Sequence, residues 1–182
     1  MSRKLPISDA TWKQLTECNR VAVKQGWASP GVFATGVGPE YDPTSNLALL
    51  YVGKSAGPLG TLVGSNTNQT TSGAASTKWM VEKRNKSAFC QMIDLIDPSR
   101  RRIAWTNISK MDEVGGSRPL PANRWPAIAE PHLQALKEEI ASLAPASSSS
   151  QLPGIAVQRL LYCWKTLVTK VGRLDFATAT PG

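Results

Sequence analysis

A Gly-Lys-Ser tripeptide at residues 53–55 follows an apolar run and is the first segment that could carry chemistry. Gly-Lys-Ser also ends the phosphate-binding P-loop, which needs a further glycine five residues before the Gly that precedes the lysine. That position is Ala48, inside the apolar run, and Ala-Gly-Pro-Leu-Gly after Ser55 would interrupt the helix that a P-loop requires. The sequence therefore excludes a P-loop.

A glycine-rich turn at the end of a strand is the remaining interpretation. Residues 47–52 are apolar on both faces, which is typical of a central parallel strand. In open α/β sheets, ligands bind beyond the carboxyl ends of the strands. Gly53, Gly57 and Gly60 would let the backbone approach a ligand closely. An ordinary strand-to-loop turn without a ligand would explain the same glycines.

A second apolar run, Ile-Ala-Trp-Thr-Asn-Ile-Ser at residues 103–109, also ends in polar residues. If the two strands are parallel neighbours, Asn107 and Lys110 lie near the same sheet edge as Gly53. An amide both donates and accepts hydrogen bonds, which is what reading the edge of a nucleic-acid base requires. A simple turn or capping role is the alternative for Asn107.

Three segments have the apolar spacing of amphipathic helices: residues 8–25, 87–97 and 130–143. In the last of these, the apolar face consists of Leu133, Leu136, Ile140 and Leu143. The order helix, strand, helix, strand, helix predicts an α/β fold with a parallel sheet. We predict loops over the ranges rich in Gly, Pro, Ser or Thr, which are 28–46, 53–76 and 110–127.

Composition and charge bound the class of protein. The chain has 182 residues, enough for one domain with a core, and a formal net charge of +8. That charge suits DNA as a partner, although many soluble domains are simply basic. The three cysteines are scattered and form no C-x-x-C, so we predict no metal centre or cofactor and a reducing, cytoplasmic location. The first residues contain no apolar core of signal-peptide length and no apolar run is long enough to span a membrane, so we expect no membrane partner.

The stretches Leu-Leu-Tyr-Val-Gly-Lys-Ser-Ala-Gly and Ile-Ala-Trp-Thr-Asn-Ile-Ser-Lys together resemble two motifs of the uracil-DNA glycosylase superfamily. The resemblance covers residues 47–143. It implies a three-layer sandwich with a central parallel sheet, in which the first motif positions the catalytic water and the second carries an asparagine that reads the flipped uracil. The base-binding residues it implies are Gly53, Lys54, Ser55, Gly57 and Asn107.

The same resemblance implies that Lys110, Arg118 and Arg124 contact DNA phosphates, and it also brings out departures from the family. Lys54 stands where active relatives have an acidic or amide residue, and an ammonium cannot accept a proton from water. No His-Pro-Ser follows, and the single histidine, His132, is predicted to be a half-exposed helix residue. We therefore expect base excision to be slow or undetectable. The alternative function is a non-catalytic α/β module that binds a nucleotide or a protein.

The chain divides at residue 144 into this α/β domain and a tail, residues 145–182. A low-complexity Pro-Ala-Ser-Ser-Ser-Ser segment occupies the place where a third strand is expected. One interpretation is a genuine linker leading to an amphipathic helix at 160–171. The other is a frame-shifted read of the missing strand. If the serines use TCN codons, reading from the last base of each codon gives NTC, which encodes Phe, Leu, Ile or Val, so the shifted frame would contain an apolar run. In that case the sheet is incomplete at its C-terminal side.

Overall fold

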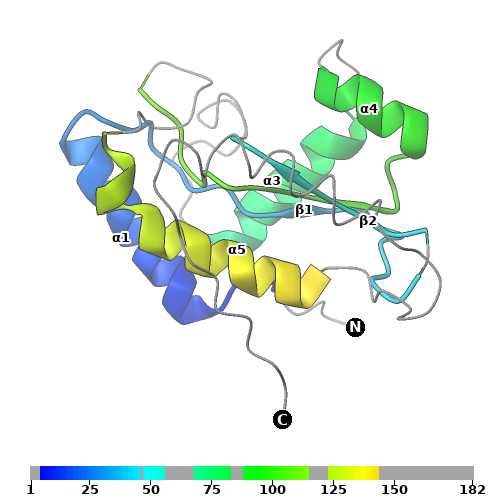
Figure 1. Ribbon diagram of the computed structural model, residues 1–182, viewed down its shortest axis with the longest axis horizontal. Helices are drawn as coiled ribbons and strands as arrows, with labels where there is room; N and C mark the ends of the chain where they lie inside the picture. The colour runs from blue at the N-terminus through cyan, green and yellow to red at the C-terminus, as the bar shows by residue number, and fades with distance from the viewer. Residues whose placement is uncertain (1–4, 46, 56–67, 83–87, 115–122, 144–182) are drawn as a thin grey trace. The chain divides into compact units, whose positions relative to one another are not determined.

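The computed structural model describes residues 5–45, 47–55, 68–82, 88–114 and 123–143 (Figure 1). Contacts divide the chain into two units, Met1–Ser147 and Ser148–Gly182, and the described residues all belong to the first. The tail at 145–182, with both interpretations of its serine run, lies outside the described residues. Within the described ranges, no helix is both long and apolar enough to cross a membrane.

The sheet contains the strands β1 (Gly36–Val37), β2 (Leu49–Gly53) and β3 (Ile103–Asn107) in the order β1-β3-β2. β2 and β3 pair in parallel, which confirms the two predicted strands as neighbours. β1 pairs with β3 in the antiparallel direction and lies in the predicted loop at 28–46. The sheet is therefore mixed, and the prediction of a purely parallel sheet is wrong for these three strands. Helices and a mixed sheet in one unit make the fold α/β.

Three of the predicted helices are present. They are α1 (Asp9–Lys24), α4 (Ala88–Ile96) and α5 (Ala129–Leu143). α1 begins after Ser8, whose hydroxyl accepts a hydrogen bond from the backbone N–H of Thr11 at 3.3 Å. This contact satisfies one of the donors that a helix start leaves unpaired. A short 3₁₀ turn, η1 (Trp125–Ala127), lies in the predicted loop at 110–127.

A further helix, α3 (Gln69–Glu82), overlaps the predicted loop at 53–76 and corrects it. Its residues are mostly small and polar, so the sequence has no apolar stripe from which this helix could be predicted. Small side chains instead let α3 lie close to β1: a Cβ at Gly36 would be 2.9 Å from the backbone of Ser76. The hydroxyl of Ser72 donates to the carbonyl of Val32 at 2.7 Å, which ties α3 to the segment before β1.

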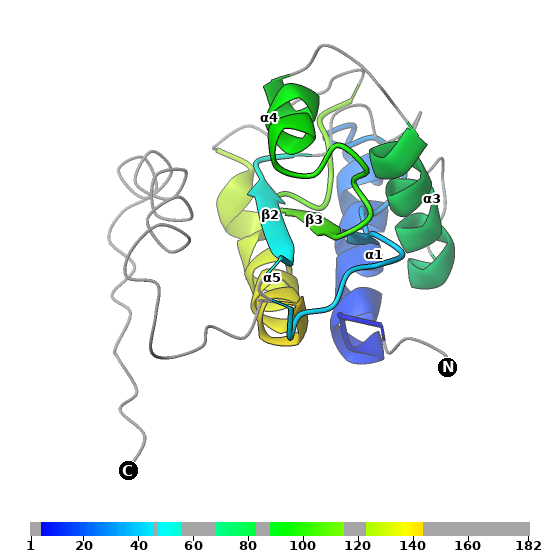
Figure 2. The same cartoon turned by 90° about the vertical axis from the view of Figure 1, so that its right-hand side faces the viewer.

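Side chains from helices cover both faces of the sheet. On one face, Ile103 and Trp105 of β3 pack against Met80 of α3 and Ile93 of α4. On the other face, Ala104 of β3 packs with Leu143 of α5. α5 packs against α1, and Figure 2 shows α4 above the strands, α3 at the far right and α5 at the left. The core therefore lies in two layers, one on each side of β3.

The arginine triplet at residues 100–102 is neutralised by carboxylates. Arg100 is fully buried, with a left-handed backbone (φ 56°), and donates to both carboxylate oxygens of Asp94 at 2.8 Å each. Arg101 pairs with Glu40, and Arg102 lies 3.6 Å from a carboxylate oxygen of Asp97. Arg100 is therefore structural, whereas the side chains of Arg101 and Arg102 are 47% and 39% exposed and form ion pairs at the surface.

Candidate functional site

Gly53 and Asn107 lie directly opposite each other in the register of β2 and β3. Because the two strands are parallel, both residues lie at the carboxyl end of the sheet. The pairing continues beyond them: the N–H of Ile108 donates to the carbonyl of Gly53 at 2.9 Å, and that of Ser109 donates to the carbonyl of Lys54 at 3.0 Å. The prediction that the two motifs share one sheet edge is therefore confirmed.

The side chain of Asn107 packs against the Cα of Gly53. A Cβ at Gly53 would lie 2.2 Å from Oδ1 of Asn107 and 3.3 Å from a ring carbon of Tyr51. Real Cβ atoms essentially never approach a neighbour as closely as the first of these distances. Residue 53 must therefore be glycine for the side-chain amide of Asn107 to lie over β2.

The amide of Asn107 is buried and only partly satisfied. Its Oδ1 accepts a hydrogen bond from Nε1 of Trp105 at 3.3 Å, whereas Nδ2 has no partner among the described residues. The side chain has 0% exposure. Leaving such a donor unpaired costs about 1–3 kcal/mol, so an unpaired group in a folded protein needs an explanation. A ligand with a hydrogen-bond acceptor would provide one.

We expect Gly53→Ala to lower the free energy of unfolding by about 1–3 kcal/mol, because the added methyl group overlaps Oδ1 of Asn107. Chemical denaturation of the purified variant measures the loss. In an Asn107→Ala background the overlap is absent, so the same Gly53→Ala change should cost clearly less. If the costs of the two changes simply add, the close approach of these two residues does not matter for stability.

The other residues of the predicted base-binding set lie around this pair. Lys54 is exposed and Ser55 is half-buried, and both follow β2 directly. Gly57 lies outside the described residues, as does Arg118 of the predicted phosphate-binding set. The site that can be described therefore consists of Gly53, Lys54, Ser55 and Asn107, at one end of β2 and β3.

Lys110 is not where a phosphate contact requires it. Its side chain has 0% exposure, and its ammonium pairs with the equally buried carboxylate of Glu139 on α5. It also donates to Oγ1 of Thr106 at 2.6 Å, and the hydroxyl of Thr35 donates to the other oxygen of Glu139. The predicted phosphate contact is wrong for Lys110, because its charge is already neutralised inside the protein.

The direction of the β3 side chains explains this buried network. Successive side chains on a strand point to opposite faces, so Thr106 faces α5 while Trp105 and Asn107 face away from it. The hydroxyl of Thr106 on β3 donates to the carboxylate of Glu139 on α5 at 2.6 Å. Burial lowers the pKa of Lys110, and the neighbouring Glu139 opposes that shift. We did not anticipate Glu139 from the sequence, although it lies three residues after Leu136, on the same helix face.

His132 belongs to the same buried region and corrects the prediction of a half-exposed residue. It has 0% exposure, and its Nδ1 accepts a hydrogen bond from the backbone N–H of Lys110 at 3.1 Å. The pKa of His132 is lowered to about 3, mainly by burial and to a smaller extent by the positive charge of Lys110. A hydrogen bond to the Ile108 backbone opposes this shift. His132 is therefore neutral at physiological pH and serves to hold the segment after β3.

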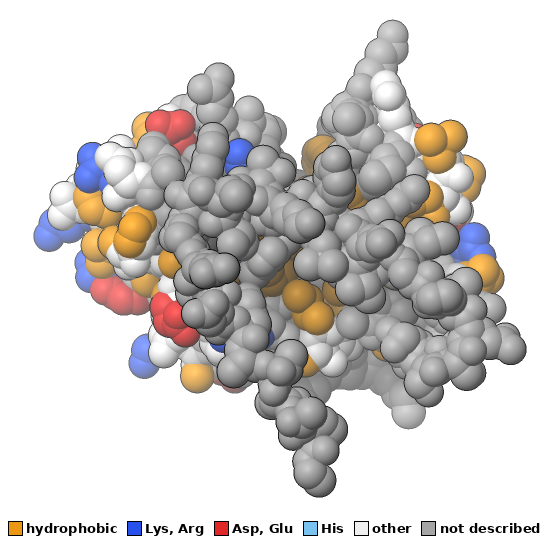
Figure 3. Space-filling model, viewed as in Figure 1, with side chains coloured by type: hydrophobic (Ala, Val, Ile, Leu, Met, Phe, Trp, Pro, Cys, Tyr) orange, Lys and Arg blue, Asp and Glu red, His pale blue; other side chains and the backbone are white. Residues whose placement is uncertain are grey.

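Arg124 is the remaining residue of the predicted phosphate-binding set. It is half-buried, and its guanidinium carbon lies 4.4 Å from the ring centroid of Trp27, a cation–π contact. On the face shown in Figure 3, basic side chains near α1 are interspersed with acidic ones. Of the described residues in the predicted base-binding and phosphate-binding sets, Lys54 and Arg124 are the cations that could still contact a phosphate.

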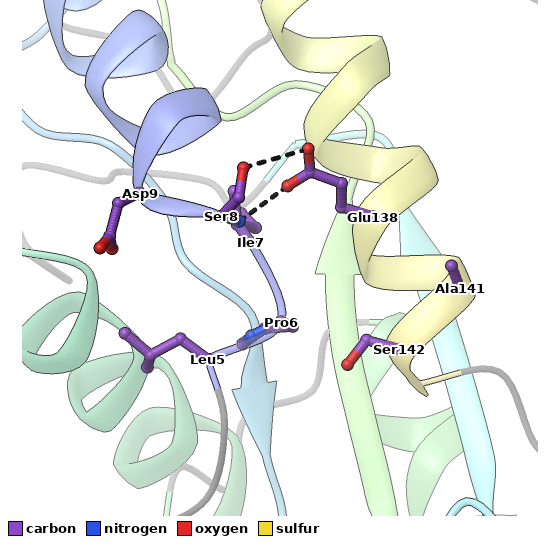
Figure 4. Close-up of a pocket in the computed structure, with 8 residues that line it drawn as sticks. All are labelled: Leu5, Pro6, Ile7, Ser8, Asp9, Glu138, Ala141 and Ser142. Carbon is purple, nitrogen blue, oxygen red and sulfur yellow. Dashed lines mark hydrogen bonds between the residues drawn. The ribbon is translucent and has the colours of Figure 1, made fainter.

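A cavity of about 620 Å³ lies away from the strand ends, between the segment before α1 and the last turns of α5 (Figure 4). Its one α5 carboxylate, Glu138, accepts hydrogen bonds from the backbone N–H of Ser8 at 2.7 Å and the hydroxyl of Thr11 at 2.6 Å. Burial alone would raise the pKa of Glu138, but its hydrogen bonds, that from Thr11 first, lower it. These contacts give Glu138 a structural role at the start of α1.

In the part of the chain that the structure describes, no three His, Cys, Asp or Glu residues are grouped so that they could hold a metal ion. Comparisons of the chain with protein-family models, with curated proteins and with solved structures found no match.

Proposed function

We propose that this protein is uracil-DNA glycosylase-like and recognises a base in DNA at the carboxyl ends of β2 and β3, with excision slow or absent. One observation carries the proposal. Asn107 lies opposite Gly53 in a parallel strand pair, and its buried Nδ2 has no hydrogen-bond partner among the described residues. An amide in this place can read the edge of a base that has left the helical stack.

The fold that goes with this proposal is a three-layer sandwich whose sheet is incomplete at its C-terminal side. It is supported by the parallel pairing of β2 with β3 and by the helices that pack on both faces of the sheet. In open α/β sheets, such strand ends are the usual place for a ligand.

The proposed chemistry gives each residue one role. Nδ2 of Asn107 donates to an acceptor on the base, and the close backbone of Gly53 leaves room for the amide. The ammonium of Lys54 contacts phosphate but cannot activate a water molecule, because it has no acceptor. Since Asn107 is fully buried, the atoms that shield its side chain from solvent must move before a base can reach it. The missing acceptor on Lys54 favours binding over turnover.

A non-catalytic α/β module that binds a nucleotide or a protein is the second candidate function. It is favoured by Lys54 in the place of a water-activating residue and by the burial of Arg100 in its pair with Asp94, which removes that charge from any DNA-binding surface. The two candidates differ in one measurable property, because this module would not distinguish DNA with uracil from DNA without it.

The test is binding to single-stranded DNA that carries one uracil, one cytosine or one abasic site, over a series of salt concentrations. We expect weak binding that falls as salt rises, a preference for uracil that Asn107→Ala removes, and excision that is slow or undetectable. Lys54→Asp should raise excision by restoring a carboxylate, whereas Lys13→Asp, the same change at an exposed position of α1, should not. Robust excision by the wild type, or binding that ignores the base, would contradict the proposal.

A further inference from the structure

We infer that Trp105 is a positioning residue that fixes the orientation of the Asn107 amide, so that the site offers a hydrogen-bond donor and selects a base with a carbonyl group over one with an amino group. The base selection rests on the proposed function, whereas the positioning does not. The inference starts from the contact between Nε1 of Trp105 and Oδ1 of Asn107 at 3.3 Å.

An indole N–H can only donate a hydrogen bond, whereas an amide has one acceptor end and one donor end. If the amide of Asn107 turned over, its NH₂ group would face the N–H of Trp105, and two donors would meet in a buried place where neither could reach water. The orientation with Oδ1 toward Trp105 is therefore the one that the surroundings permit. Nδ2 is then the free end, in agreement with its lack of a partner among the described residues.

Trp105 is itself held firmly. It is 3% exposed and lies in the cluster with Phe33 and Met80. Its ring centroid lies 4.9 Å from that of Phe33, with a 60° angle between the ring planes, and 5.0 Å from that of Trp79, with a 34° angle. Since residues two apart on a strand point to the same face, Trp105 and Asn107 are neighbours through the strand as well. A fixed indole can fix the amide beside it.

A site that presents only a donor to position 4 of a pyrimidine distinguishes the bases by the exocyclic group there. Uracil carries a carbonyl at the position where cytosine carries an amino group, so uracil would accept from Nδ2 while cytosine would place a donor against it. We expect the wild type to prefer uracil over cytosine roughly tenfold or more, because a buried donor left without an acceptor is penalised.

The positioning is tested without any DNA. In ¹H–¹⁵N NMR spectra, the indole signal of Trp105 is identified as the one missing in Trp105→Phe. We expect this signal to shift in Asn107→Leu, which removes the acceptor, and to shift less in Asn107→Asp, which keeps an oxygen there. An indole signal unchanged in Asn107→Leu would overturn the inference, and unshifted signals from the other indoles would show that the variant is folded.

The base selection is tested by binding to single-stranded DNA with one uracil or one cytosine. Trp105→Phe keeps a ring but lacks the N–H, so we expect it to reduce the uracil preference roughly tenfold, toward no preference. Trp12→Phe is the same change in a separate buried cluster, where Trp12 of α1 lies with Leu15 and with Ala135 of α5, and it should leave the preference as in the wild type. A preference unchanged in Trp105→Phe would overturn the inference. No preference in the wild type would overturn the base selection and the proposed function together, while the NMR result would still decide the positioning.

Discussion

Lys110→Met should lower the free energy of unfolding by about 3–5 kcal/mol, the cost of leaving one member of a buried ion pair without its partner. Both Lys110 and Glu139 have 0% exposure, so no water can take the place of the missing ammonium. Glu139 would keep the hydroxyls of Thr35 and Thr106 as donors, but these are neutral and do not compensate its charge. Urea denaturation followed by tryptophan fluorescence measures the change.

The double variant Lys110→Met with Glu139→Leu is the control for that result. It removes both charges together, and apolar replacements of buried ion pairs are often close to neutral. We therefore expect it to be clearly more stable than either single variant, which gives a large coupling energy in a double-mutant cycle. If the double variant lost the sum of the two single losses, Lys110 and Glu139 would not act as a pair. As a further control, Lys13→Met should change the stability little, because Lys13 is exposed.

Acidification should destabilise the protein already between pH 7.5 and 5, by about 2 kcal/mol from His132 alone. Burial and the nearby charge of Lys110 lower the folded-state pKa of His132 from 6.5 to about 3. The unfolded chain therefore takes up the proton first as the pH falls. The contribution of His132 is fully present well above pH 6.5, and it decreases as the pH falls from 6.5 toward 3.

His132→Asn isolates this effect. Asparagine does not titrate in this range, and its side-chain oxygen can still accept the hydrogen bond that Nδ1 of His132 accepts from the N–H of Lys110. The stability of this variant should depend much less on pH between 7.5 and 5. The carboxyl groups of Asp97 and Glu138, whose pKa values are lowered, lose their contributions only at lower pH. An unchanged pH profile in His132→Asn would contradict the assignment.

Local patterns were enough to predict most of the elements. The helix at α1 and the strands β2 and β3 follow from apolar spacing and from the turn residues that bound each run, and both are properties of neighbouring residues. α3 and β1 were missed for a physical reason. α3 has small polar residues that pack closely against the chain instead of an apolar stripe, and β1 is two residues long and exists only through its pairing with β3.

The burial of α5 shows where a pattern was insufficient. The predicted apolar face included Leu133 and Ile140, which are only half-buried, whereas His132 and Glu139 are fully buried. The buried face of α5 is therefore rotated by one residue from the predicted apolar face. It can contain polar side chains because each has a hydrogen-bond partner: His132 pairs with the backbone of Lys110, and Glu139 pairs with Thr106. Spacing alone favours apolar residues, since it contains no information on such partners.

The sequence by itself determined that β2 and β3 form, that they end in glycine and asparagine, and that α1, α4 and α5 are helical, because these features depend on residues close together in the chain. Only the tertiary structure decided how charges and amides are used. Lys110 became a buried partner of Glu139 and not a phosphate contact, and Asn107 came to lie over Gly53 with its oxygen held by Trp105. The physical reason is that desolvation and pairing depend on which distant side chains meet, and these meet only when the helices pack on the sheet.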